Sequence, residues 1–191
     1  MKSNLIMGKL FWVGVLYFAE GFPYGLINDA LPVYFRFHGV SLQDIGLLSL
    51  AGLAWTFKFL WAPAVDMLFK RKSWIVACQV LMAVLALIFS IGSDSGALSP
   101  LFWGLLIGLA FLSATQDIAI DAYTIEFLDS GEMGQANGIR VAFYRAALIV
   151  SGGILIAWAG WAGWRGAFAV AALVMGVSAL AVSRAPFVVL K

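Results

Sequence analysis

Long apolar stretches dominate the chain and predict helices that cross a membrane. Four stretches contain no Asp, Glu, Lys or Arg: residues 73–93, 95–116, 146–164 and 166–183. Residues 10–31 are interrupted only by Glu20 and Asp29, and residues 45–65 only by Lys58. About 20 mostly apolar residues suffice for a helix to cross the hydrocarbon core, and turn residues separate the stretches. We therefore predict six transmembrane helices, near residues 8–35, 43–67, 73–93, 98–127, 134–158 and 164–183.

The composition agrees with this pattern and excludes several classes of protein. Of the 191 residues, 63% are hydrophobic and 12% are charged. A soluble domain is roughly 45–50% apolar and about 25% charged. A soluble enzyme, a nucleic-acid-binding module and a disordered chain are therefore excluded. We expect an all-α membrane protein whose residues 1–191 form a single six-helix bundle, with membrane lipid as its main solvent and no nucleic acid as partner.

The positions of lysine and arginine predict the orientation of the chain. With six crossings, one side of the membrane receives seven basic residues: Lys2, Lys9, Lys70, Arg71, Lys72, Arg184 and Lys191. The other side receives Arg36 and Arg165. Basic residues concentrate in cytoplasmic loops. We therefore predict a multi-pass protein of the cell (inner) membrane with both termini in the cytoplasm.

A few ionisable residues fall well inside the predicted helices. They are balanced in sign: Glu20, Lys58, Asp117, Asp121, Arg140 and Arg145. Each costs about 2.5–3.5 kcal/mol if it faces lipid at the centre of a helix, so these side chains should face the bundle interior or water. Two interpretations remain open. The charges form ion pairs that hold helices together, or they line a polar cavity or ion path.

The distribution of these charges favours the cavity. The first and fourth predicted helices carry acids, the second and fifth carry bases, and the third and sixth carry none within their spans. This is a three-plus-three repeat in the placement of charge, and repeats of three helices are typical of secondary transporters. We expect the first, second, fourth and fifth helices to line a central path.

The first predicted helix places polar residues on one face around a predicted break. Tyr17, Glu20, Tyr24 and Asn28 recur at helical spacing. Gly21 and Pro23 lie among them, and proline removes one hydrogen bond from a helix. We predict a bend or break at Gly21 and Pro23 beside the carboxylate of Glu20, the kind of place where transporters bind ligands.

A pair of carboxylates marks the fourth predicted helix. Asp117 and Asp121 are one turn apart, and Gln116 is adjacent to the first. Two carboxylates so close in a medium of low dielectric constant resist ionising together, so they need a shared proton or a cationic partner. Arg140 and Arg145 on the next helix supply partners. Their spacing of five points them in different directions, so that one can pair with an acid while the other reaches a substrate.

Metal and enzyme chemistry have little support in the sequence. The chain has one cysteine, Cys78, and one histidine, His38, which are too few for a zinc site built from such ligands. No metalloprotease, serine-nucleophile or phosphate-loop motif is present. We expect no metal, no cofactor and no enzymatic activity. An intramembrane enzyme that uses the acid cluster is the less favoured alternative.

Three runs of sequence resemble the AmpG muropeptide-permease family. The runs are IGLLSLAGLAWTFKFLWAPAVD at 45–66, FLSATQDIAIDAY at 111–123, and GIRVAFYRAALIVSGG at 138–153. Members of this family resemble the acetyl-CoA transporters and some siderophore importers, which share the glycine-X-proline element found here as Gly21, Phe22 and Pro23. The resemblance covers essentially the whole chain.

The resemblance implies a fold and a gate. Such permeases belong to the major facilitator superfamily, in which two six-helix halves surround a central cavity. This chain corresponds to the N-terminal half, and its partner would be a missing C-terminal half or a second copy. The resemblance assigns Asp66, Lys70, Arg71 and Lys72 to a cytoplasmic gate.

The resemblance also implies proton-driven import of anhydromuropeptides into the cytoplasm. Here Glu20 replaces an expected small polar residue, which leaves other substrates open, such as siderophores or acetyl-CoA-like solutes. A non-transporting half-size membrane subunit is a further alternative. The residues expected to bind protons or the small-molecule substrate are Glu20, Asp117, Asp121, Lys58, Arg140, Arg145, Gln116, Tyr24 and Tyr144.

Overall fold

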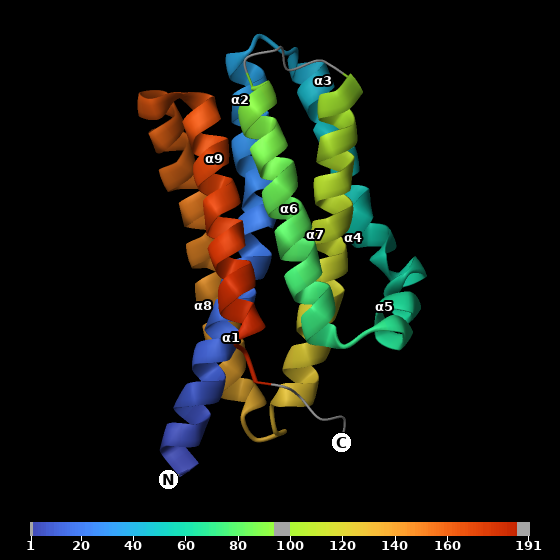
Figure 1. Ribbon diagram of the computed structural model, residues 1–191, viewed down its shortest axis with the longest axis vertical. Helices are drawn as coiled ribbons and strands as arrows, with labels where there is room; N and C mark the ends of the chain where they lie inside the picture. Colours follow the sequence, from blue (N-terminus) through green and yellow to red (C-terminus); the bar gives the residue numbers. More distant parts are fainter. Residues whose placement is uncertain (1, 94–99, 187–191) are drawn as a thin grey trace.

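The computed structural model describes residues 2–93 and 100–186, and every element within them is helical (Figure 1). The elements in chain order are α1 (Lys2–Gly25), the π-helix η1 (Leu26–Ala30), α2 (Leu31–Phe37), α3 (Leu42–Leu47), the 3-10 helix η2 (Leu48–Gly52), α4 (Leu53–Phe57), the 3-10 helix η3 (Lys58–Leu60), α5 (Ala62–Leu68), α6 (Arg71–Gly92), α7 (Pro100–Phe127), α8 (Met133–Ile149), the π-helix η4 (Val150–Ile154) and α9 (Leu155–Ser183). The predicted start of a helix at residue 98 and the basic residue Lys191 lie outside the described residues. The predicted all-α fold class is confirmed.

Four helices are long and apolar enough to cross a membrane: Ile6–Phe37, Arg71–Gly92, Phe102–Phe127 and Met133–Ser183. Helices Leu42–Leu60 and Ala62–Leu68 pass the same test together, bent by 56°. The chain is therefore a multi-pass membrane protein.

The helix predicted at 43–67 is interrupted in the structure. It consists of short α-helical and 3-10 pieces from Leu42 to Leu68. Pro63 explains the sharpest bend, because it occupies the first turn of α5 and cannot continue the hydrogen bonds of the preceding helix. Lys58 lies at the junction of α4 and η3, directly before this bend. Lys58 therefore lies where the helix changes direction.

The last continuous helical stretch is also broken. Met133–Ser183 has 51 residues, whereas about 20 suffice for one crossing. Its backbone leaves helical geometry at Gly163, whose φ of 79° and ψ of 162° suit glycine. The ribbon rises through α8 and descends through the red part of α9 (Figure 1). This change of direction agrees with the turn predicted around residues 160–163.

Helix α1 lies at the centre of the bundle and contacts α7, α8 and α9, while α6 packs mainly against α9 and α7. Two apolar clusters form the core. Aromatic residues dominate one cluster, including the fully buried Tyr34, Phe89 and Phe168. The other cluster lies around Val13 and Ile120. The first helix therefore has neighbours on several sides, and its polar residues must find partners inside the bundle.

Helix α1 continues through Gly21 and Pro23, so the break that was one of the two predicted outcomes is absent. Proline has no N–H, so the carbonyl oxygen of Ala19 loses its usual helical donor. Two buried glutamines replace that donor. Gln79 Nε2 donates to Ala19 O at 2.7 Å, and Gln116 Nε2 donates to it at 3.0 Å. Freed backbone groups in membrane helices are satisfied by neighbouring helices in this way.

Helix α1 leaves α-helical geometry just after Gly25. There η1 begins, and it contacts the second π-helix, η4. Glycines also let the end of α1 approach α8 and η4 closely. A Cβ on Gly25 would stand 2.1 Å from Ser151 Oγ of η4, and a Cβ on Gly21 would stand 2.8 Å from the carbonyl oxygen of Tyr144 of α8. A larger residue at either position would push these segments apart.

Candidate functional site

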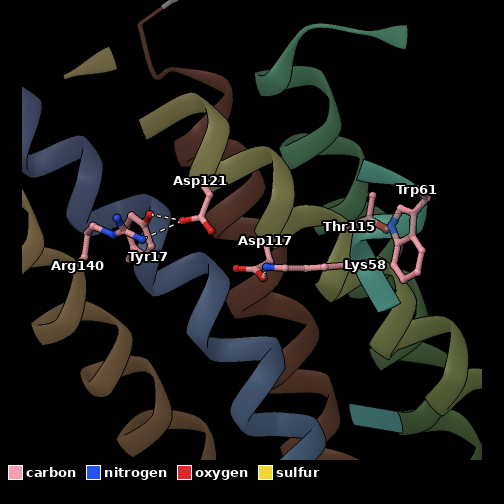
Figure 2. Close-up of polar contacts among 7 residues, drawn as sticks. All are labelled: Tyr17, Lys58, Trp61, Thr115, Asp117, Asp121 and Arg140. Carbon is pink, nitrogen blue, oxygen red and sulfur yellow. Dashed lines mark hydrogen bonds and ion pairs between the residues drawn. The ribbon is translucent and has the colours of Figure 1, made fainter. Parts of the chain in front are cut away.

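Arg140 on α8, Asp121 on α7 and Tyr17 on α1 form one polar cluster (Figure 2). Arg140 Nη2 donates to Asp121 Oδ1 at 2.9 Å, and Tyr17 Oη donates to the same oxygen at 2.7 Å. The guanidinium carbon of Arg140 also lies 4.4 Å from the centre of the Tyr17 ring, which adds a cation–π contact. One carboxylate oxygen thus joins three helices through charge-assisted hydrogen bonds. The predicted pairing of an arginine with the acids of the preceding helix is present.

Asp117 takes a different partner, Lys58 (Figure 2). Lys58 Nζ is hydrogen-bonded to Asp117 Oδ2, with side-chain exposures of 31% for the lysine and 12% for the aspartate. Trp61 supports the same contact between segments, since its Nε1 donates to Thr115 Oγ1 at 3.1 Å. The two acids that one turn separates are therefore neutralised by bases from two different segments.

Glu20 is a third acid near these ion pairs. Its carboxyl group interacts with Asp117 and with the charges of Asp121 and Arg140. Its Oε2 atom is buried and has no hydrogen-bond partner among the described residues. A carboxyl group away from water and next to another carboxyl is costly to ionise. This oxygen is the unpaired polar atom of the site.

A cavity of about 220 Å³ opens beside Glu20. Seven residues line it: Tyr17, Glu20, Asn137, Arg140, Val141, Tyr144 and Arg145. Asn137 and Val141 were not among the residues predicted from the sequence. Asn137 lies three residues before Arg140, and Val141 lies three before Tyr144 and four before Arg145, and this spacing on one helix was the signal that could have found them.

Arg145 is the exposed base of the cavity. None of the described residues forms an ion pair with it. Arg140 is therefore the arginine that binds an acid, and contact of Arg145 with a substrate stays a prediction.

Aromatic rings adjoin this arginine. The rings of Tyr24 and Tyr144 have centres 6.0 Å apart, and Tyr24 meets Trp55 edge-on at 5.0 Å. All three side chains are half-buried. They join α1 to α8 and to α4 and give the site an apolar wall beside its charges.

Gln116 lies away from this cavity. Its side chain is fully buried, and its amide holds the Ala19 carbonyl oxygen described above. Its place beside Asp117 in the sequence does not put it on the same face, because successive residues of a helix are about 100° apart. The structure therefore gives Gln116 a packing contact between α1 and α7 in place of the predicted contact with substrate.

The residues predicted to form a gate meet at one end of the bundle. Arg71 Nη1 lies 2.9 Å from Asp66 Oδ1, and Arg71 Nε lies 3.3 Å from Glu126 Oε1. Lys72 Nζ donates to the Ala185 carbonyl oxygen at 2.6 Å, and Lys70 immediately precedes α6. Glu126, the second acid on Arg71, was not predicted from the sequence. Arg71 thus ties α5 and α6 to the end of α7.

A second cluster closes the turn between α7 and α8 at the same end. Lys9 Nζ lies 2.7 Å from Glu132 Oε2 and 3.0 Å from Asp129 Oδ2. Lys9 and the backbone N–H of Asp129 hold the pKa of Glu132 below its usual range. Both acids belong to the turn, so Lys9 attaches the beginning of α1 to it.

Comparison with known proteins shows that the chain is similar in sequence to parts of proteins named as transporters. A family model described as acetyl-coenzyme A transporter 1 matches residues 9–98. The anhydromuropeptide permease of Escherichia coli (strain K12) is 35% identical over 152 residues, which are 74% of this chain and 30% of the permease. A putative transporter, AmpG 4, of Rickettsia felis is 31% identical over 153 residues, covering 75% of this chain and 36% of that protein.

A protein of Haemophilus influenzae without an assigned function is 32% identical over 159 residues, covering 81% of this chain and 37% of that protein. The matches confirm the predicted resemblance to AmpG-like permeases and to the acetyl-CoA transporter family. The chain spans about a third of the length of these relatives.

Proposed function

We propose that the chain is one six-helix half of a secondary active transporter of the major facilitator type. It would couple the entry of an amphipathic solute into the cytoplasm to the entry of protons. The observation that carries this proposal is the polar site of Glu20, Asp117 and Asp121, which joins segments at membrane depth beside an open cavity. Charges at that depth are costly and mark ion and substrate pathways in membrane proteins.

Two features support six crossings. The stretch Met133–Ser183 reverses direction at its break, so it supplies two spans, and the bent segment from Leu42 to Leu68 supplies one. The beginning of α1 and the end of α9 lie at the same end of the molecule (Figure 1), as an even number of crossings requires. Lys9 and Arg71 lie in the clusters at that end, which we assign to the cytoplasmic side.

The exposed face of the site supports a second half. Asp121 and Arg140 keep 40% and 32% of their side chains exposed although they lie within spans. Lipid cannot solvate such groups, so this face should border a water-filled cavity between two bundles. A C-terminal six-helix unit or a second copy of the chain would complete it. A three-plus-three repeat of helices is part of this proposal, with charged residues at depth on α1, the segment of Lys58, α7 and α8.

Proton coupling would use the three acids together. Glu20 has a buried, unpaired oxygen beside Asp117, while Asp117 holds Lys58 and Asp121 holds Arg140. A proton that binds to one of these acids neutralises its carboxylate and weakens the ion pair with Lys58 or Arg140. The released base and the exposed Arg145 would then be free to bind anionic groups of the solute. Binding and protonation would be coupled through shared partners.

The proposed solute is an anhydromuropeptide or a compound of similar character. The permease from Escherichia coli bears that name, and the site combines charged groups with Tyr24, Tyr144 and Trp55. Sugars and peptides stack on aromatic rings and carry carboxylates, so both features suit such a solute.

The test is uptake of a radiolabelled anhydromuropeptide by proteoliposomes that contain the purified chain. An inward proton gradient should drive accumulation, and a protonophore should abolish it. Uptake that is equal with and without the gradient would contradict proton coupling. Absence of uptake by the chain, together with uptake after addition of a C-terminal half, would identify this chain as an incomplete transporter.

The gate gives a separate prediction. Arg71→Gln should lower the free energy of unfolding by about 1 kcal/mol, because Glu126 and Asp66 lose a partly exposed cation. Arg71→Lys should recover only part of it, since an ammonium cannot reproduce the forked contact of a guanidinium. Loss of tryptophan fluorescence during denaturant unfolding in detergent measures the effect. Arg184→Gln is the matched control because it removes an exposed cation whose described contact is with Leu180 of its own helix. Equal effects of both variants would reject the gate contact.

A further inference from the structure

Asp29 is a carboxylate within a span that the proposed proton site does not include. It belongs to η1, about 12 Å from the Phe37 end of the span Ile6–Phe37. Its side chain is exposed, and none of the described residues gives it a hydrogen bond or an ion pair. An unpaired carboxylate at this depth needs water or a cationic ligand.

The contact of the two π-helices fixes the position of this carboxylate. Asp29 lies against Gly152 of η4. A Cβ on Gly152 would stand 2.8 Å from both Cβ and Oδ2 of Asp29, so the aspartate occupies the space that glycine leaves open. Turns of π-helix are frequent at functional sites because they present side chains that a regular helix would turn away. The backbones of η1 and η4 therefore determine where the Asp29 carboxylate lies.

Arg145 is the complementary charge on the same helix pair. It is exposed and lines the cavity, and it has no described carboxylate partner. Along the helix, Arg145 and Gly152 are separated by about 10 Å. An unpaired base and an unpaired acid therefore flank one stretch of α8 and η4, at a spacing that a small solute can bridge.

Two tyrosines lie on the same helix pair. Tyr144 precedes Arg145 in the sequence and lines the same cavity. Tyr24 lies one turn before Asn28 on the helix that continues into η1, and its ring centre is 6.0 Å from that of Tyr144. Aromatic rings from both helices therefore adjoin the segment that carries the acid and the base.

We propose that Asp29 and Arg145 are two subsites for a zwitterionic solute, in which Asp29 binds an ammonium group and Arg145 binds a carboxylate. The tyrosines contact the uncharged part between them. This inference rests on the proposed transport function and adds to it the charge pattern of the substrate. The proton site of Glu20, Asp117 and Asp121 remains a separate group.

Equilibrium binding to the purified chain in lipid nanodiscs tests this inference. The probes are a radiolabelled anhydromuropeptide with a free amine, the same compound with the amine acetylated, and the same compound with its carboxylates amidated. The unaltered chain should prefer the first probe over each of the others by about tenfold. Asp29→Asn should remove the preference for the free amine and keep that for the carboxylates. Arg145→Gln should do the reverse.

A variant that moves the carboxylate without removing it sharpens the test. Gly152→Ala should displace Asp29 and also weaken the preference for the amine, whereas Gly153→Ala, where an added Cβ meets nothing within 4 Å, should not.

Contrary outcomes fall into two kinds. Equal binding of the amine and acetyl probes, or no binding of the free-amine probe, would overturn the inference. Proton-driven uptake that ignores the amine would also overturn it, while leaving the transport function in place.

Discussion

Replacing Pro23 by alanine should abolish the loss of stability that follows from substituting the two buried glutamines, Gln79 and Gln116. In the natural background, Gln79→Leu combined with Gln116→Leu leaves the Ala19 carbonyl oxygen buried without a donor, which costs about 1–3 kcal/mol. In the Pro23→Ala background, residue 23 regains an N–H and donates to that oxygen itself. The same two leucines should then be neutral or stabilising, because they also remove two buried amide oxygens that have no described partner, Oε1 of Gln79 and of Gln116.

The measurement is a double-mutant comparison of unfolding free energies in detergent. The coupling between Pro23 and the glutamine pair should be about 1–3 kcal/mol. Gln135→Leu is the matched control, because it replaces an exposed glutamine of α8 and should show no coupling to Pro23. A glutamine effect of the same size in both backgrounds would show that the amides do not substitute for the missing N–H.

Asp117→Asn should abolish proton-driven uptake, and it should also destabilise the chain. The lost partner leaves Lys58 as an unpaired cation at membrane depth. Breaking a buried pair costs about 3–5 kcal/mol, and the 31% exposure of Lys58 reduces this to about 1–3 kcal/mol. Loss of uptake by the single variant could therefore result from lower stability or from lost proton coupling.

The double variant Lys58→Met with Asp117→Asn separates these two defects. It removes both charges, so the unfolding free energy should return toward that of the unaltered chain, while uptake driven by a proton gradient should remain absent. Glu132→Gln is the matched control, since Glu132 lies outside the spans and pairs with Lys9. Normal gradient-driven accumulation by the double variant would remove Asp117 from the proton site.

The helical class and several contacts of the site could be predicted from the sequence because both follow from the free-energy cost of placing polar or charged groups in lipid. Apolar length determines which segments can enter lipid, and the cost of charge at depth requires acids and bases to meet. The pairing of Asp121 with Arg140 follows from helices that are consecutive in the chain. The choice of Lys58 as the partner of Asp117 depends on helix rotation and on the bend at Pro63, which no local pattern determines.

The role of Gln116 and the continuity of α1 could not be predicted for a related reason. A proline in a helix frees a carbonyl, and whether the helix breaks depends on what neighbouring helices offer to that oxygen. The donors come from residues distant in the sequence, Gln79 and Gln116, and their meeting at Ala19 is a property of the packed bundle. Glu126 was missed because a carboxylate near a helix end is ordinarily solvated.

The two π-helices affect how this sequence should be aligned with related sequences. A π turn takes up one residue more than an α turn, so each of η1 and η4 rotates everything after it by about 100° relative to an uninterrupted α-helix. Tyr34, which follows η1, belongs to the buried aromatic cluster. In a relative that lacks one residue in η1, the side chain that fills this position would come from one place earlier in the sequence. An alignment without a gap there would pair residues that point in different directions.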